Sequence, residues 1–260
     1  MKKVLTIAGS DSGGGAGIQA DLKAMTALGV YGMSAITALT AQNTLGVSAI
    51  SPVEPSFLKA QLDAVFTDLR PDAVKIGMVS SQDSIKVIAD RLSFYNAQNI
   101  VIDPVMVATS GAQLSQNDAV SAMQKLLFPL ATLITPNMPE AEVLADIPVR
   151  DLSDMRTAAE KISVACNSPV LCKGGHGIEN ATDILYADGV FTVFQGQHID
   201  TKNTHGTGCT LSSAIASFLA KGFPLPIAIE EGKKYLEGAL RYGLNIGHGN
   251  GPLWHGYTIC

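Results

Sequence analysis

Short apolar runs alternate with longer segments of helical periodicity over most of the chain. The apolar runs predict strands at Val4–Ala8, Met33–Leu39, Ala73–Met78, Ile100–Val105, Thr132–Thr135 and Val170–Lys173. The segments between them carry apolar residues at i, i+3 and i+4 and predict helices at Ile18–Leu28, Ser56–Leu69, Ser84–Tyr95, Ala119–Leu130, Glu140–Ala145 and Met155–Cys166. Strands that alternate with helices form βαβ units, so the pattern predicts an α/β fold around a mainly parallel sheet.

The later part of the chain departs from this alternation. Asp183–Phe194 predicts a β-hairpin that turns at Asp188-Gly189, and Leu211–Lys221 is an amphipathic segment that follows a run of small residues. No repeat, low-complexity tract or linker interrupts the sequence, so we expect a single domain over residues 1–260. Open α/β sheets bind ligands outside the carboxyl ends of their strands, and the unusual residues of this sequence lie at those ends.

Composition narrows the class of partner. The chain has 260 residues, of which 47% are hydrophobic, which is ample for a core. Its net charge of −5 and its lack of a dense Lys/Arg run argue against binding nucleic acid or an anionic membrane. The sequence shows no signal peptide and no run of the roughly 18 apolar residues that a membrane span needs. The four cysteines have neither CxxC nor zinc spacing, so we expect a reduced, cytoplasmic protein with a small-molecule partner.

A glycine-rich segment, Ala8–Asp21, joins the first predicted strand to the first helix. Its backbone N–H groups and the helix start could bind an anion or a polar ligand. It lacks the GK[ST] of a Walker A loop, and Ile18 stands where a dinucleotide fingerprint needs its third glycine. The alternative is a tight turn without a ligand. Asp21 is either a ligand contact or a favourable carboxylate in the first helical turn.

Polar residues follow the next strands. Gln42, in "TAQNT", has an amide that donates and accepts at once, which suits the edge of an amino-substituted heteroaromatic ring, although a loop glutamine is often only solvated. Asn137 and Glu140, in "ITPNMPEAE", stand three apart at a strand-to-helix junction and could face one magnesium ion, or they could simply cap the helix. Asp103, at the end of the strand in "VIDPVM", is a third candidate metal ligand.

Lys173, in "LCKGGHG", leaves a strand beside glycines and could reach a phosphate or be an ordinary exposed lysine. We interpret the neighbouring His176 as a solvated loop residue. In "NTHGTGCT", a helix that begins near Gly206–Thr210 would direct free N–H groups at an oxyanion or a phosphate. The same field would lower the pKa of the Cys209 thiol and make it partly thiolate, unless Cys209 is a buried structural thiol.

Together, "TIAGSDSGGGAGIQADLK", "ITALTAQNT", "KIGM", "IDPVM", "ITPNMPEAE", "KGGH" and "NTHGTGCT" resemble, in the same order, the hydroxymethylpyrimidine/phosphomethylpyrimidine kinases of thiamine biosynthesis. The resemblance implies a three-layer α/β/α ribokinase-like fold, commonly a homodimer, and a kinase that depends on ATP and Mg²⁺. Such a kinase phosphorylates 4-amino-5-hydroxymethyl-2-methylpyrimidine on its hydroxymethyl oxygen and then converts the monophosphate to the diphosphate.

The resemblance also implies roles for individual residues. The pyrimidine pocket would be lined by Gly9, Asp21, Gln42 and Met78. Magnesium and its waters would be organised by Asn137 and Glu140, and ATP would contact Asn137, Lys173, Thr204 and Gly208. The N–H groups of Gly206–Gly208 would form an anion hole, in which Gly206, Gly208, Lys173 and Cys209 would act in catalysis. Cys209 stands where sugar kinases of the superfamily carry aspartate, so it would accept or orient the hydroxymethyl proton.

Two features bear on the substrate. The segment Val105–Leu114 matches a flap of the family and contains no cysteine. Pyridoxal kinases that share most of these motifs tend to carry a flap cysteine and another residue at the Gln42 position. The sequence therefore favours the pyrimidine, with pyridoxal or pyridoxine as the alternative substrate and a non-catalytic binding protein as the alternative class.

Overall fold

The computed structural model describes residues 1–106, 117–175 and 181–259. These residues form one sheet of nine strands in the order β3-β2-β1-β4-β5-β6-β7-β8-β9. The strands are β1 (Lys3–Asp11), β2 (Tyr31–Asn43), β3 (Gly46–Pro52), β4 (Ala73–Ile76), β5 (Ile100–Ile102), β6 (Leu133–Ile134), β7 (Val170–Lys173), β8 (Asp183–Ala187) and β9 (Val190–Phe194).

The strand directions agree with the prediction. Strands β2, β1, β4, β5, β6 and β7 run parallel to one another. Antiparallel pairing occurs at the two edges, where β3 pairs with β2 and where β8 pairs with both β7 and β9. Strands β8 and β9 form the predicted hairpin, and both Asp188 and Gly189 have positive φ, which fits a tight hairpin turn. The carboxyl ends of the six parallel strands therefore meet at one edge of the sheet.

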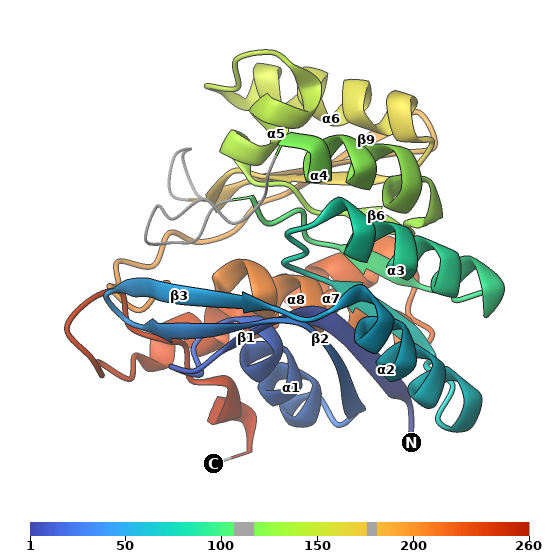
Figure 1. The fold of residues 1–260 in the computed structure, drawn as a ribbon. Helices are drawn as coiled ribbons and strands as arrows, with labels where there is room; N and C mark the ends of the chain where they lie inside the picture. Colours follow the sequence, from blue (N-terminus) through green and yellow to red (C-terminus); the bar gives the residue numbers. More distant parts are fainter. Residues whose placement is uncertain (107–116, 176–180, 260) are drawn as a thin grey trace.

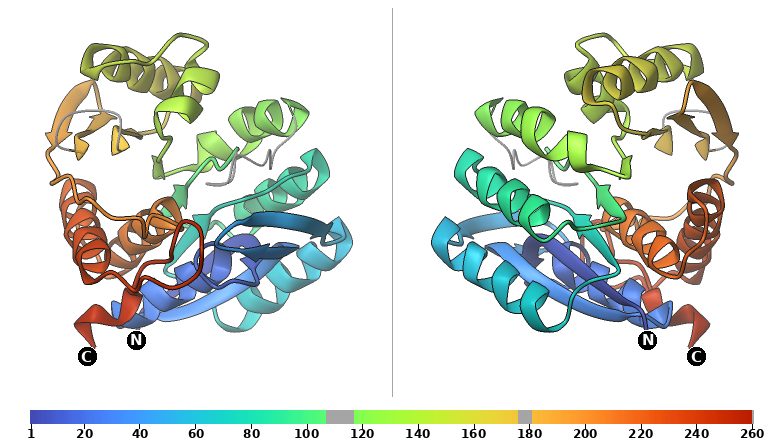
Figure 2. Two further views of the ribbon diagram at one scale, coloured as in Figure 1. Left: turned by 90° about the vertical axis from the view of Figure 1, so that its left-hand side faces the viewer. Right: turned by 90° about the vertical axis from the view of Figure 1, so that its right-hand side faces the viewer.

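Helices cover both faces of this sheet (Figures 1 and 2). One face carries α1 (Gly17–Ala27), α7 (Thr207–Ala220) and α8 (Leu225–Tyr242), and the other carries α2 (Pro55–Asp68), α3 (Gln82–Phe94), α4 (Asn117–Ala122), α5 (Met138–Ala145) and α6 (Leu152–Cys166). Side chains alternate between the faces as a strand requires, because Ile100 and Ile102 join one buried cluster and Val101 joins the other. The three-layer α/β/α fold is confirmed.

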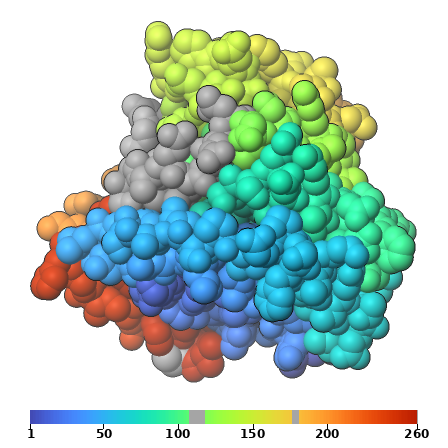
Figure 3. All heavy atoms as spheres, in the orientation of Figure 1, coloured from blue at the N-terminus to red at the C-terminus, as the bar shows by residue number. Residues whose placement is uncertain are grey.

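The structure differs from the predicted elements in several places. The predicted helix Ala119–Leu130 is α-helical only as far as Ala122, and it continues as a π-helix, Met123–Leu127, and a 3-10 helix, Phe128–Leu130. Strand β3 was not predicted because every residue of Gly46–Pro52 is partly or fully exposed, so no apolar run marks it, and it lies in the blue band across the middle of Figure 3. Helix α8 was not predicted either. Strand β2 continues to Asn43, so Gln42 belongs to a strand and not to a loop. No described helix has the length and apolar character that crossing a membrane demands.

Candidate active site

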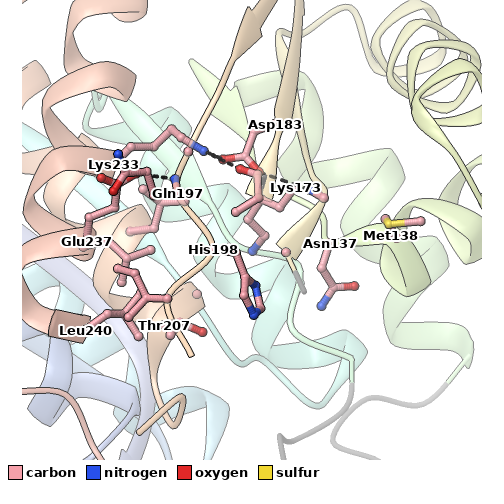
Figure 4. A pocket seen from close by; sticks show the side chains of 18 of the residues that line it. Asn137, Met138, Lys173, Asp183, Gln197, His198, Thr207, Lys233, Glu237 and Leu240 are labelled. Carbon is pink, nitrogen blue, oxygen red and sulfur yellow. Dashed lines mark hydrogen bonds and ion pairs between the residues drawn. The ribbon is translucent and has the colours of Figure 1, made fainter. Parts of the chain in front are cut away.

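Two adjoining cavities, of about 590 Å³ and 180 Å³, lie at the carboxyl edge of the sheet, where ligand-binding residues were expected. The larger cavity lies between α8, the end of the β8–β9 hairpin and the start of α5 (Figure 4). The smaller one lies among the ends of β1 and β2 and the start of α7. Both cavities are lined by Asn137, Lys173, Thr207 and Gly208. A ligand in one cavity would therefore meet a ligand in the other at these residues.

The smaller cavity brings together most of the residues expected around a pyrimidine. Gly9 at the end of β1, Gln42 in β2 and Met78 after β4 all line it, as does Cys209 in α7. A side chain at position 9 would place its Cβ 3.2 Å from the Met78 sulfur, so the small residue leaves room at the cavity wall. The fold thus joins residues that are far apart in the sequence.

Asp21 does not line either cavity, contrary to the expectation. It is fully buried below the smaller cavity, where both of its oxygens lie 2.9 Å from the ammonium nitrogen of Lys75. Thr6 and Ser213 also donate hydrogen bonds to its carboxylate, each at 2.6 Å. Burial alone would lower the pKa of Lys75, but the charge of Asp21 raises it above the ordinary value. Asp21 is therefore part of an internal ion pair and has no direct access to a ligand.

The glycine-rich loop is occupied by a side chain of its own strand. The Asp11 carboxylate accepts backbone hydrogen bonds from Gly13, Gly15 and Ala16 at 2.8, 3.0 and 2.8 Å. Burial alone would raise the pKa of Asp11, but the hydrogen bonds from His205 and from the backbone lower it below its ordinary value. These three N–H groups already bind the Asp11 carboxylate, so they are not free for an external anion. The loop still borders a possible ligand, because Gly9, Ser10, Asp11, Ala16 and Gly17 line the smaller cavity.

The start of α7 forms part of the wall between the two cavities. Gly206 is the N-cap with φ +87°, and a Cβ there would lie 1.9 Å from the Gly15 carbonyl oxygen, so only glycine fits. Gly206 lines the smaller cavity and Gly208 lines both. Thr204 lines neither, and its carbonyl accepts a hydrogen bond from the Thr207 N–H at 3.3 Å. Thr204 was expected to contact ATP, but it borders neither of the two cavities.

Cys209 lies in the first turn of α7, as the sequence predicts, but its acidity is the opposite of the expectation. Burial raises the pKa of the Cys209 thiol to about 11, although the neighbouring Lys75 ammonium opposes the shift. Burial therefore outweighs the helix field. The residue is a neutral thiol at pH 7, and one that borders the smaller cavity.

A cluster of charged groups stands between the cavities. Lys173 donates to Asp103 Oδ1 at 2.8 Å, and Asp103 is almost fully buried. Burial raises the pKa of the nearby Glu140 to about 7, against the opposing charge of Lys173. Burial alone would lower the pKa of Lys173, but Asp103 and Glu140 raise it. This cluster holds two carboxyl groups and one ammonium in little solvent.

Asn137 and Glu140 form a capping box, which was the alternative interpretation of this motif. The Asn137 side chain accepts from the Glu140 N–H at 2.9 Å, and Glu140 Oε2 accepts from the Asn137 N–H at 2.8 Å. Among the described residues, no group of three or more His, Cys, Asp and Glu side chains could hold a metal ion by itself. A cation here would need further oxygen ligands from water or from a bound phosphate.

Several residues of the larger cavity were missed by the sequence reasoning. Lys233 of α8 pairs with the buried Asp183 and also donates to the Ala181 carbonyl oxygen at 3.2 Å. Glu237, one turn later, accepts from the Gln197 N–H at 3.2 Å. Figure 4 shows Lys233 and Glu237 on one side of the cavity and Asn137 on the other. Their i, i+4 spacing in an amphipathic segment was the available signal, and it went unused because α8 was not predicted.

Comparison with known proteins agrees with this geometry. The family model of phosphomethylpyrimidine kinase matches residues 11–254. A thiamine biosynthesis bifunctional protein of Geobacter sulfurreducens is 52% identical over 97% of this chain. That protein is longer, and the match covers 52% of its length. The hydroxymethylpyrimidine/phosphomethylpyrimidine kinase of Bacillus subtilis is 46% identical, with 97% of this chain and 94% of the relative covered.

Among solved structures, an ADP complex of Bacillus subtilis pyridoxal kinase superposes with a TM-score of 0.91 at 37% identity, over 98% of this chain and 97% of the other. Both relatives from Bacillus subtilis are kinases by name, and one of them was solved with ADP, which supports the use of ATP by this fold. The match of the family model covers nearly the whole chain and includes every residue that lines the larger cavity and all those of the smaller cavity except Ala8, Gly9 and Ser10. The chain belongs to the phosphomethylpyrimidine kinase family.

Proposed function

We propose that this protein transfers the γ-phosphoryl group of ATP to the hydroxymethyl oxygen of 4-amino-5-hydroxymethyl-2-methylpyrimidine, and then phosphorylates the monophosphate to the diphosphate. The observation that carries the proposal is the pair of cavities that meet at Asn137, Lys173, Thr207 and Gly208. The larger has room for a nucleotide and the smaller for a single substituted ring. Phosphoryl transfer needs such a shared boundary, because the attacking oxygen must approach the γ-phosphorus in line with the oxygen that leaves it.

In this proposal the protein acts mainly through position and charge. The α7 N-terminus and the Lys173 ammonium would stabilise the charge that develops on the transferred group. Cys209, a neutral thiol beside the acceptor cavity, would orient the hydroxymethyl group and would not act as a thiolate base. A loose transition state needs only a weak base, so orienting the hydroxymethyl group is a sufficient role for Cys209.

The charged cluster also fits magnesium. Asp103 and Glu140 offer carboxylate oxygens, and Lys173 balances only one of the two charges when both are ionised. We propose that these carboxylates, with Asn137, hold Mg²⁺ through its waters while the nucleotide phosphates supply the remaining ligands. When bound, the ion would neutralise charge on the phosphates.

We further propose that the chain acts as a single domain and as a homodimer. The β2–β3 edge presents the exposed apolar residues Leu39, Leu45 and Ile50, which suits an interface between two copies. Light scattering coupled to size-exclusion chromatography measures this directly, and a monomer at micromolar concentration would argue against it.

The activity is tested by incubating the purified protein with ATP, Mg²⁺ and the pyrimidine and following products by mass spectrometry. We expect the monophosphate first and the diphosphate later. The relation to pyridoxal kinase makes pyridoxal the second candidate substrate, so kcat/KM is measured for both. Replacing Gln42→Met should lower kcat/KM for the pyrimidine by about tenfold or more, because ring-edge polar groups lose a partner, and should change the pyridoxal value less. Equal losses on both substrates would contradict a ring-reading role for Gln42.

A further inference from the structure

His205 lies between the glycine-rich loop and Gln42, in the wall of the smaller cavity. Its Nε2 is 2.9 Å from Asp11 Oδ2 and 3.4 Å from the Gln42 amide nitrogen. His205 as a residue is 7% exposed, so these contacts form in little solvent. His205 Nε2 therefore faces both Asp11 and Gln42. Whether Nε2 carries a hydrogen determines whether it donates to a neighbour or accepts from one.

Asp11 determines the state of that nitrogen. Its carboxylate already accepts hydrogen bonds from the N–H groups of Gly13, Gly15 and Ala16, which stabilise the ionised form. An ionised carboxylate only accepts hydrogen bonds. His205 Nε2 must therefore carry a hydrogen and donate, because a lone pair at 2.9 Å from the carboxylate oxygen would be repelled. A donor at Nε2 cannot accept a hydrogen bond from the Gln42 NH2 group.

Thr40 places an independent requirement on Gln42. The Thr40 hydroxyl oxygen lies 2.8 Å from the Ser10 carbonyl oxygen and 3.1 Å from Gln42 Oε1. The hydroxyl has one hydrogen, and a carbonyl oxygen can only accept it. When that hydrogen goes to Ser10, the Thr40 oxygen is left as an acceptor for Gln42. Thr40 then requires the amide nitrogen of Gln42 on its side.

His205 and Thr40 therefore favour the same orientation of the Gln42 carboxamide, with its oxygen toward His205 and its nitrogen toward Thr40. The two ends of a carboxamide have nearly the same shape and are assigned from such networks, so exchanging them needs no extra space. We propose that His205 is a positioning residue for specificity: its Nε2–H, held by Asp11, fixes the direction in which Gln42 presents its carboxamide to the substrate.

The consequence for the ligand rests on the proposed function. The edge of a 4-aminopyrimidine offers a donor, the amino group, beside an acceptor, the ring nitrogen. A Gln42 amide with a fixed direction pairs with this edge through its oxygen and its free N–H. The 4-oxo analogue has the reverse order, because its ring N–H donates and its oxygen accepts. It pairs only if the amide turns, which His205 and Thr40 both oppose.

The test is the ratio of kcat/KM for the 4-amino substrate to kcat/KM for its 4-oxo analogue. His205→Gln and His205→Met have similar length, but only glutamine keeps an N–H donor near the position of Nε2. We expect His205→Met to lower the ratio by about tenfold or more and His205→Gln to retain most of it. Equal ratios in the wild type and His205→Met, or no preference in the wild type, would overturn the proposal.

A second measurement does not depend on turnover or on a variant that folds. Nitrogen-15 NMR of histidine side chains in the wild-type protein distinguishes the two ring nitrogens. We expect hydrogen on Nε2 of His205, and a neutral ring with hydrogen only on Nδ1 would overturn the proposal. If the wild type leaves the 4-amino substrate unchanged, the proposed function fails, whereas the NMR result still decides whether His205 can fix Gln42.

Discussion

Cys209 shows how burial and a helix terminus compete at one side chain. The first turn of α7 favours a negative charge, and by itself would make the thiol more acidic. Removal from solvent penalises the thiolate more, and the pKa rises to about 11. The sequence contains the helix start but carries no measure of how deeply residue 209 is packed, so the prediction of a thiolate was wrong while the position was right.

We expect Cys209→Ala to lower kcat by about 10²-fold, because the hydroxymethyl group loses its orienting partner. Cys209→Ser should lose less, since a hydroxyl can still accept or donate a hydrogen bond. Steady-state kinetics at saturating ATP measure both variants. Wild-type rates in Cys209→Ala would show that the thiol only packs.

The raised pKa also predicts slow alkylation of Cys209. The thiolate is the reactive form, and at pH 8 a thiol of pKa about 11 is only about one-thousandth ionised. The rate of iodoacetamide labelling should therefore rise about tenfold per pH unit between pH 7 and pH 10. Peptide mass spectrometry of Cys209 follows the rate, with the unfolded chain as reference. A plateau near pH 8 would mean that the thiol is not shifted upward.

Asp21 is a second residue whose role the sequence did not reveal. Asp21 is the fifth residue of α1 and so lies beyond its first turn, where the sequence had placed it, and its partners Thr6, Lys75 and Ser213 come from three other segments. Only the folded chain brings them together. The expected substrate contact was wrong because the carboxylate points into the protein and not into the cavity.

We expect Lys75→Met to destabilise the protein by about 3–5 kcal/mol, because it leaves the buried Asp21 charge without its counter-ion. The double variant Asp21→Asn/Lys75→Met should be more stable than Lys75→Met alone, since no buried charge remains. Urea unfolding of the wild type, both single variants and the double variant gives the coupling. Purely additive losses would show that the ion pair contributes no interaction of its own.

Among the elements, those with strong apolar periodicity were predictable and those defined by tertiary context were not. The central strands are buried on both faces and read as apolar runs, whereas β3 pairs only with β2 and has no buried residue. Helix α8 has the apolar periodicity of a helix, but it begins at Leu225, only a few residues after the apolar helix α7 ends at Ala220. The flap prediction at Val105–Leu114 and the interpretation of His176 concern residues 107–114 and 176, which lie outside the described part of the chain.

The start of α7 supplies a prediction at this scale. We expect Gly206→Ala to be strongly destabilising and to abolish activity, because φ is +87° and the new Cβ would lie 1.9 Å from the Gly15 carbonyl oxygen. Gly222→Ala is the matched control, since its φ is +90° and nothing lies within 4 Å of a Cβ there. The control should cost only the backbone strain, about 1–2 kcal/mol. Similar melting temperatures for the two variants would contradict the close approach of the α7 start to the glycine-rich loop.

At the scale of the whole molecule, the sheet places two cavities side by side and leaves Asn137, Lys173, Thr207 and Gly208 common to both. This arrangement predicts that a non-hydrolysable ATP analogue and the pyrimidine bind at the same time. A ligand at 100 times its Kd stabilises the folded state by about 2.7 kcal/mol, which for a protein of this size corresponds to a rise in Tm of roughly 5–10 °C.

We therefore expect each ligand alone to raise Tm, and the two together to raise it further than either does at saturation. Differential scanning fluorimetry with each ligand, then with both, makes the comparison. Lys233→Met should reduce the response to the nucleotide analogue and leave the response to the pyrimidine, because Lys233 lines only the larger cavity. If the pyrimidine instead cancels the effect of the nucleotide analogue, the two ligands compete for one cavity, and the transfer geometry proposed for this chain is wrong.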